Sequence, residues 1–189
     1  MTAGEGGGKA SRGGPLSGDG WSGRTLDEVE VGADLRPAWR RGDKTIEADA
    51  IAFWARMNIL PAGVDPAARA RELAAVAYEG GRLVAVSTAA IARYEPLRAS
   101  FAFYRCAVDP SQRRSLLATA ITAFTRDVVE AWAAEHPEEG VAGLAAIIES
   151  PDLVARQRAP LWPNTRLNLA GFTPDGRQVR IAWFDHYRV

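Results

Sequence analysis

The sequence predicts a mixed α/β (α+β) protein, and three stretches of the chain carry this prediction. The segment SFAFYRCAV (100–108) places alternate side chains on opposite sides of the backbone, as a β-strand does. Apolar residues then recur at helical spacing from Leu117 to Trp132. Near the end of the chain, TPDG (173–176) separates two extended segments and is a strong hairpin turn. One chain therefore combines strands with helices.

Length and composition indicate an ordinary globular domain of 189 residues, with 47% hydrophobic and 24% charged residues. The formal net charge of +0 makes nucleic acid an unlikely partner, because binding to phosphate backbones favours a basic excess. No apolar run approaches the roughly 18 residues of a membrane span, and the first residues lack a signal-peptide core. We therefore expect a cytoplasmic protein with no membrane partner. The single Cys106 excludes an intrachain disulfide.

The first 24 residues differ in composition from the rest of the chain. They contain nine of the 18 glycines and few apolar side chains. Such a segment cannot bury enough surface to offset the entropy of ordering it. We expect a disordered tail over residues 1–24 and one folded domain over residues 25–189.

Within the domain, the first expected element is a strand over residues 29–39. A helix follows over residues 40–60, where apolar residues repeat at helical spacing and Asp43 or Thr45 can cap the start. Asp at the cap and Pro at the first position predict a second helix from residue 65 that runs through RARELAAVAYE (69–79).

The remaining elements follow from the same rules of spacing and turn chemistry. In chain order they are extended segments at 82–94 and 100–108, a helix with an apolar stripe of Leu117, Ile121, Phe124, Val128 and Trp132, an apolar strand at 143–149, a short helix or helical turn at 150–164, and hairpin strands at 166–172 and 177–189.

Two arginines, Arg113 and Arg114, lie where the helix after the 100–108 strand begins. Cations are disfavoured at a helix start, because the free N–H groups there carry partial positive charge. Those N–H groups attract anions, and a bound phosphate would make the arginines favourable. The alternative is that both arginines are solvated and Ser115 caps the helix.

The loop from Val108 to Ala118 resembles the acyl-CoA-binding loop of the Gcn5-related N-acetyltransferase (GNAT) superfamily. That loop runs Val-x-Pro, two residues, then Arg/Gln-x-x-Gly-x-Gly/Ala. Here it is VDPSQRRSLLA, with Arg113 and Ala118 at the first and last signature positions and Leu116 where the family has its middle glycine. Gly171 and Phe172 also match a Gly-Phe pair that the family often has before its last hairpin.

The resemblance implies a mostly antiparallel central sheet with helices on both faces. It also implies acetyl-CoA or another acyl-CoA as co-substrate, an amine as acceptor, and no metal. The strand before the loop would splay from the next strand, so that backbone groups of Cys106, Ala107 and Val108 pair with the pantetheine arm. A backbone N–H of Ala107 or Val108 would polarise the thioester carbonyl. The pyrophosphate would lie on the loop and helix start, which comprise Arg113, Arg114, Ser115, Leu116, Leu117 and Ala118.

Two side chains are candidates for proton transfer. Glu149 follows the apolar strand that should splay from the 100–108 strand, and a carboxylate at the mouth of an apolar cleft is well suited to act as a base. The alternative is a solvated glutamate at a strand end. Tyr104 could act as acid or base, or could be a core tyrosine. Leu167 stands where the family often has a tyrosine four residues before Gly-Phe.

Other interpretations stay open or are excluded by residue type. A catalytically silent protein of this fold, binding CoA or a protein partner, is the alternative that Leu116 and Leu167 motivate. A homodimer is also left open. His136, His186 and Cys106 are too few and too scattered for a zinc site. We expect Cys106 to be a buried core thiol.

Overall fold

The computed structural model describes residues 32–112 and 116–188. The predicted tail and the residues Arg113, Arg114 and Ser115 lie outside this part of the chain. The described helices and strands are β1 (Asp34–Pro37), α1 (Lys44–Met57), α2 (Pro66–Ala70), β2 (Leu73–Glu79), β3 (Arg82–Tyr94), β4 (Ala99–Val108), α3 (Leu117–Glu135), β5 (Val141–Ile147), α4 (Pro151–Arg156), β6 (Leu161–Trp162), β7 (Leu167–Phe172) and β8 (Gln178–Trp183).

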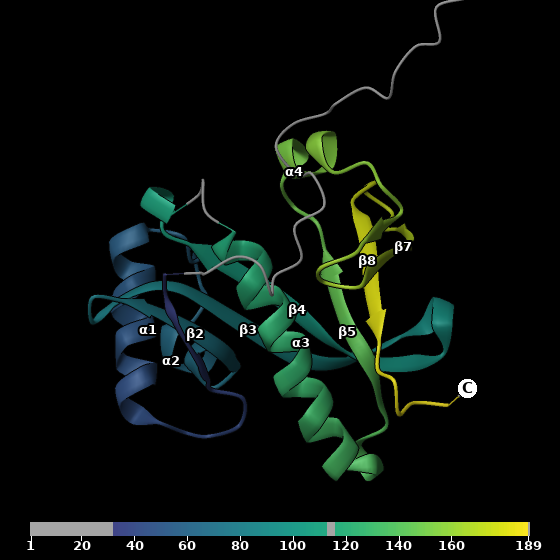
Figure 1. Cartoon of the computed structure of the whole chain (residues 1–189), viewed down its shortest axis with the longest axis horizontal. Helices are drawn as coiled ribbons and strands as arrows, with labels where there is room; N and C mark the ends of the chain where they lie inside the picture. Colours follow the sequence, from purple (N-terminus) through teal and green to yellow (C-terminus); the bar gives the residue numbers. More distant parts are fainter. Residues whose placement is uncertain (1–31, 113–115, 189) are drawn as a thin grey trace, which may run out of the picture.

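In the described part of the chain, the strands form one eight-stranded sheet in the order β1-β2-β3-β4-β5-β8-β7-β6 (Figure 1). All neighbouring pairs are antiparallel except β4 and β5, which are parallel. Parallel neighbours need a long crossover connection, and α3 supplies it. The mixed, mostly antiparallel sheet that the resemblance implied is confirmed.

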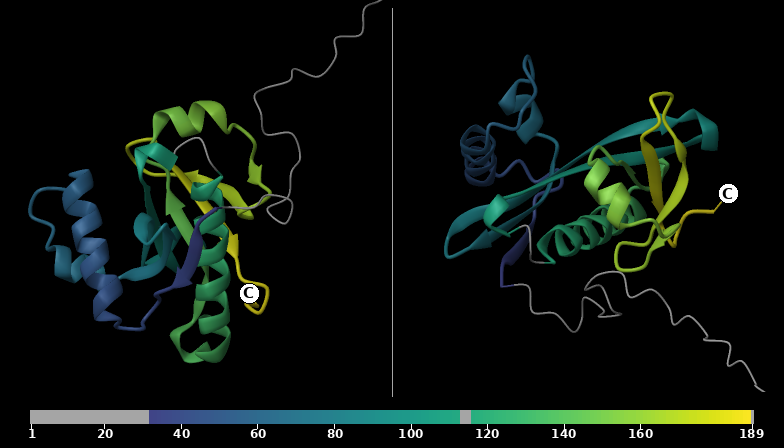
Figure 2. Two further views of the ribbon diagram at one scale, coloured as in Figure 1. Left: turned by 60° about the vertical axis from the view of Figure 1, so that its left-hand side comes forward. Right: turned by 90° about the horizontal axis from the view of Figure 1, so that it is seen from above.

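Helices cover both faces of this sheet, as Figure 2 shows from above. Phe53 and Trp54 of α1 pack on Val86 of β3, with Ala107 of β4 against the same cluster. On the opposite face, Ile121 of α3 packs among apolar residues of β2 and β3. We call these the α1 face and the α3 face. The α4 helix packs with α3 in one cluster and therefore lies on the α3 face.

Helix α1 has the local signals that the sequence predicted. The Asp43 carboxylate accepts hydrogen bonds from the backbone N–H groups of Thr45 and Ile46, which satisfies donors that have no partner inside the helix. The helix ends at Asn58, which adopts the left-handed conformation. Of the two capping candidates, Asp43 is therefore the one that caps.

The second helix was predicted to run from residue 65 to residue 79, and this prediction is wrong after residue 70. Helix α2 ends at Ala70, and residues 73–79 form strand β2 instead. The alanine-rich sequence favours a helix locally, but the residues from Leu73 to Tyr78 are buried between the two helical layers and pair with β1 and β3. Tertiary pairing therefore overrides propensity. The Gly80-Gly81 pair, with φ of 55° and 79°, makes the tight turn into β3.

Helix α3 buries a stripe close to the predicted one. Leu117 and Ile121 are buried as expected, while Phe124, Val128 and Trp132 are only half-buried. Thr125 and Val129 are buried instead, so the buried stripe is rotated slightly around the helix. No helix in the described ranges is long and apolar enough to span a membrane.

Gly143 lies where the backbone of β8 passes close to β5. The pairing register of β4 and β5 shifts between Ser100 and Ala102, so β5 carries an extra residue in a bulge. A Cβ atom built on Gly143 would lie 2.3 Å from the carbonyl oxygen of Ala182. No side chain fits there without displacing β8.

Replacing Gly143 with alanine is therefore expected to lower the free energy of unfolding by about 1–3 kcal/mol. Chemical denaturation measures this change. Gly32→Ala is the matched control, because no atom lies within 4 Å of a Cβ built on Gly32. Its effect should stay within about 0.5 kcal/mol. An equal loss of unfolding free energy in Gly143→Ala and Gly32→Ala would contradict the packing argument.

Candidate functional site

Strands β4 and β5 pair only over part of their length. Their last paired residues are Tyr104 and Ala146. Beyond this point β4 continues beside β3 as far as Val108, while β5 continues beside β8, where Ile147 pairs with Val179. Figure 1 shows the two strands separating toward the end of the sheet where α3 begins and α4 lies. We call this region the β4–β5 splay.

The strand register identifies which backbone groups of β4 face the splay. The Asp109 N–H donates to the carbonyl of Val84 at 2.8 Å. In an antiparallel pair the residues alternate between facing the partner strand and facing away from it. Ala107 therefore bonds toward β3, whereas Cys106 and Val108 direct their N–H and C=O groups toward the splay. Three residues were expected to contact the pantetheine arm through their backbone. Of these, Ala107 is the one whose N–H and C=O groups point away from the splay.

The start of α3 lies at the end of the loop that follows β4. Leu116 is the N-cap residue, with φ −77° and ψ 10°, and its side chain makes no capping bond. The first turn has no acidic residue. Leu116 is half-buried, Leu117 is buried and Ala118 is exposed. Helix starts attract anions in general, because their N–H groups carry partial positive charge.

Asp109 fixes the loop in place, and it is the functional residue that sequence reasoning missed. Its buried carboxylate accepts bonds from the N–H and hydroxyl of Ser111 at 3.0 and 2.8 Å, from Arg82 at 2.9 Å and from Arg56 at 3.2 Å. The Ser111 bonds, followed by Arg82 and Arg56, hold the pKa of Asp109 below its ordinary value. The sequence feature that could have identified this residue is an Asp between Val108 and Pro110.

A second contact ties the loop to the β2–β3 hairpin. The side-chain amide of Gln112 donates to the Glu79 carboxylate at 2.6 Å. Together with Asp109, this contact connects the loop to α1, to β3 and to the end of β2. Residues 109–112, which follow β4, are therefore held by polar contacts to three other elements.

Tyr104 lies on the α3 face at the point where the two strands separate. Its hydroxyl is 2.7 Å from the Thr122 hydroxyl, which itself donates to the carbonyl of Ala118 at 2.6 Å. Because Thr122 uses its only proton on Ala118, the Tyr104 hydroxyl must donate to Thr122. Burial raises the pKa of Tyr104 well above its ordinary value, and the neighbouring Cys106 adds to the rise. This environment favours the core role for Tyr104.

Cys106 is exposed, so the expectation of a buried core thiol is wrong. It lies beyond the last β4–β5 pair, where no strand covers it on one side. Desolvation by the surrounding elements still raises the pKa of its thiol to about 11. The thiol is therefore accessible but is a weak nucleophile at neutral pH.

Glu149 lies just beyond β5, near the splay, but not in the apolar environment that the sequence suggested. Its side chain is 74% exposed, and its carboxylate is 3.7 Å from the Arg177 guanidinium of the β7–β8 turn. The expectation of a desolvated carboxylate is therefore wrong.

Arg180 is a second residue that sequence reasoning missed. It is fully buried in β8 and donates to Gln178 and to the carbonyls of Ala159 and Pro160 at 3.0–3.1 Å. Its guanidinium stacks on Trp162 at 3.9 Å. Burial lowers the pKa of Arg180. The residue fastens the segment between α4 and β7 onto the α3 face of the sheet, and no local sequence pattern signals it.

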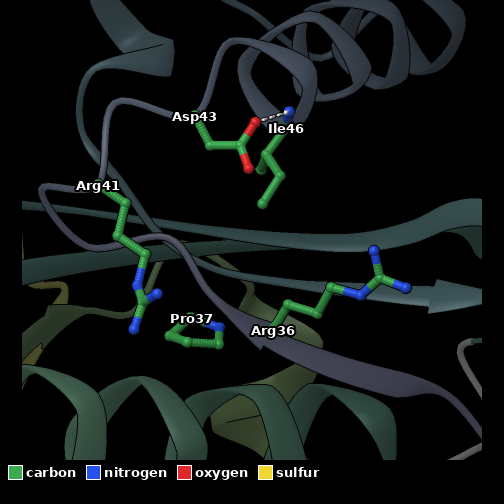
Figure 3. A pocket seen from close by; sticks show the side chains of 5 residues that line it. All are labelled: Arg36, Pro37, Arg41, Asp43 and Ile46. Atoms are coloured by element: carbon green, nitrogen blue, oxygen red, sulfur yellow. Dashed lines mark hydrogen bonds between the residues drawn. The ribbon is translucent and has the colours of Figure 1, made fainter.

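Other surface features do not assemble a site. The hollow in Figure 3 is lined by Arg36, Pro37, Arg41, Asp43 and Ile46, between β1 and α1. Asp43 there caps α1, and Arg36 pairs with Asp34 at 2.6 Å. Within the described residues, no group of three or more His, Cys, Asp or Glu side chains is placed to hold a metal ion.

The Asp109 contacts predict a pH-dependent effect on stability. Asp109→Asn removes the charge that faces Arg82 and Arg56, so the free energy of unfolding at pH 7 should fall by about 1–3 kcal/mol. Because the folded-state pKa is depressed, this stabilisation is present above about pH 4 and is lost as the pH falls through the folded value.

Denaturation of wild type and Asp109→Asn across pH 2–7 checks this prediction. The two free energies of unfolding should converge as the pH falls through the depressed folded-state pKa of Asp109. A difference that stays constant over the whole range would show that the Asp109 charge does not stabilise the loop.

Solved structures share this fold. A putative acetyltransferase of Salmonella typhimurium, solved with acetyl-CoA, superposes with a TM-score of 0.54 at 13% identity and covers 84% of this chain and 97% of its own. A GNAT-superfamily phosphinothricin acetyltransferase of Sinorhizobium meliloti, in complex with acetyl-CoA, gives 0.54 at 16% identity, covering 82% and 89%.

A scan against protein-family models and a search of curated proteins give no match. At the identities of the two solved structures, the likeness establishes the fold. The chain therefore has the fold of the GNAT-superfamily acetyltransferases, as the loop from Val108 to Ala118 predicted.

Proposed function

We propose that the protein is an acyl-CoA-dependent N-acyltransferase that moves an acetyl group from acetyl-CoA to an amine. The β4–β5 splay carries this proposal, because it leaves the backbone groups of Cys106 and Val108 without a strand partner. Backbone groups on an unpaired strand edge can pair with an extended, amide-bearing ligand as they would with a further strand. Both solved neighbours hold acetyl-CoA, which supports the same ligand here.

The pantetheine arm has two amides, and its extended chain can add to β4 as a further strand would. Its amides would pair with Cys106 and Val108, and its diphosphate would lie at the α3 start near Leu116. Arg113 and Arg114 are candidates for the diphosphate by resemblance. Leu116 offers its N–H, and its side chain is half-buried rather than projecting freely toward the ligand.

The proposed reaction is direct transfer. The amine nitrogen attacks the thioester carbonyl carbon, the carbon–sulfur bond breaks, and its electron pair leaves with the CoA sulfur. The Val108 N–H is the candidate donor to the carbonyl oxygen as negative charge develops there. Glu149 is the candidate base that takes the proton from the amine, and CoA leaves as the thiol after gaining a proton. The partners are thus an acyl-CoA and an amine, in a monomer or a homodimer.

Turnover of acetyl-CoA with a panel of amines tests the proposal, with free CoA and the acetylated amine as measured products. Product formation would support catalysis over a silent protein of the same fold. CoA binding without product formation with any amine would favour the silent alternative.

Cys106 provides an independent test of where the CoA arm lies. It is the only cysteine and is exposed beside the splay. Desulfo-CoA, which lacks a thiol, is expected to slow alkylation of Cys106 in a saturable manner at pH 9, where the rate is measurable. Adenosine 3′,5′-bisphosphate lacks the arm and is the control, expected to protect much less. Equal alkylation rates with and without desulfo-CoA would place the arm elsewhere.

Leu116 tests the site for the diphosphate. Leu116→Asp puts a negative charge at the start of α3, and Leu116→Asn makes nearly the same change of shape without the charge. We expect Leu116→Asp to bind CoA about tenfold more weakly than Leu116→Asn at low salt, because the charge repels phosphate. Calorimetric titration should show the difference shrinking as salt screens it. Equal affinities would contradict a diphosphate at this helix start.

A further inference from the structure

Arg105 is the only charged residue of strand β4, and it lies at the first position beyond the last β4–β5 pair. Its neighbours on the same side of the strand are Phe103 and Ala107, because side chains alternate along a strand. Ala107 packs against the α1 cluster, so Arg105 projects from the α1 face. The side chain is exposed there.

Among residues 32–112 and 116–188, the side chain of Arg105 has no hydrogen bond and no ion pair. Arginines close to this end of β4 and β5 have carboxylate partners. Arg56 and Arg82 pair with Asp109 at 3.2 and 2.9 Å, and Arg177 pairs with Glu149 and Asp175. Arg105 is thus a cation at the splay whose charge no described carboxylate neutralises.

The position of Arg105 is fixed although its side chain is free. Its backbone pairs with Thr88 of β3, which is buried. Phe103 packs in the cluster that contains Tyr94, and Ala107 packs in the cluster that contains Met57. The guanidinium therefore stands on a rigid strand between two apolar clusters, an arrangement suited to selecting a ligand.

The two faces of the splay differ in what covers them. Both α3 and α4 pack on the α3 face, where the helix start proposed for the diphosphate also lies. On the α1 face, α1 packs on the neighbouring Ala107 but leaves Arg105 exposed. An acceptor amine can therefore reach the thioester from the α1 face. On this path the acceptor amine meets Arg105, which is the charged side chain of β4.

We propose, resting on the proposed function, that Arg105 binds a carboxylate of the acceptor substrate. The acceptor class is then an amine with a carboxylate close to the nitrogen, as in a free α-amino acid. Arginine binds carboxylates through two parallel hydrogen bonds, so it can also orient the amine toward the thioester. The same charge repels amines that carry only positive groups, which gives selectivity against polyamines and cationic drugs.

The test compares each of several α-amino acids with its carboxamide, which keeps the side chain and the amine but lacks the negative charge. Values of kcat/KM are expressed per unprotonated amine, because the two series differ in amine basicity. The wild type is expected to prefer the acids by about 10- to 100-fold, the range for a charge-assisted hydrogen bond. Arg105→Gln should lose most of this preference, Arg105→Lys should retain part of it, and Arg105→Glu should favour the amides.

Arg41→Gln is the matched control, since it removes the same charge from the loop between β1 and α1, and β2 and β3 lie between β1 and β4 in the sheet. It should leave the preference unchanged. Affinity for desulfo-CoA, measured in every variant, separates an effect on the acceptor from damage to the fold. Two outcomes would overturn the role of Arg105 and leave the acetyltransferase proposal standing. One is a wild type that acetylates amines without preferring the acids to their carboxamides. The other is an Arg105→Gln variant that keeps the full preference for the acids. No acetylation of any amine would overturn both.

Discussion

The end of hydrogen bonding between β4 and β5 is the constraint on which the candidate site depends. After Ala146, β5 keeps its pairing with β8, while β4 keeps its pairing with β3 as far as Val108. Each strand is thus held by its outer neighbour, and the two cannot close on each other again. The backbone groups of Cys106 and Val108 face the resulting splay. The bulge at Gly143 adds to the bend of β5, because a bulge increases local twist.

The loop between β4 and α3 needs its own support, because it leaves the sheet where strand pairing stops. The Asp109 carboxylate supplies most of it by joining α1, β3 and the loop through Arg56, Arg82 and Ser111. These contacts fix residues 109–112, and fixing part of a binding loop in advance reduces the entropic cost of binding a ligand there. The same carboxylate therefore contributes to stability and to the geometry of the site.

The charges around the splay are unevenly distributed between its two sides. The β5 side carries Glu149, whose carboxylate faces Arg177. The β4 side carries Arg105, which has no partner among the described residues. Tyr104 is buried between them on the α3 face and donates to Thr122. A solvated carboxylate on one side and a free cation on the other match the two ends of a zwitterion, provided that the proposed transfer takes place here.

Local chemistry in the sequence determined the elements whose signals lie within a few residues. The Asp43 cap, the strand at 100–108 and the TPDG turn needed no distant partner, so they were predictable. Only the tertiary structure decided that Leu73–Glu79 is a strand, that Ala107 faces away from the splay, and that Cys106 and Glu149 are exposed. The reason is that pairing and burial depend on segments far apart in the chain, whereas capping and turn formation depend on neighbouring residues.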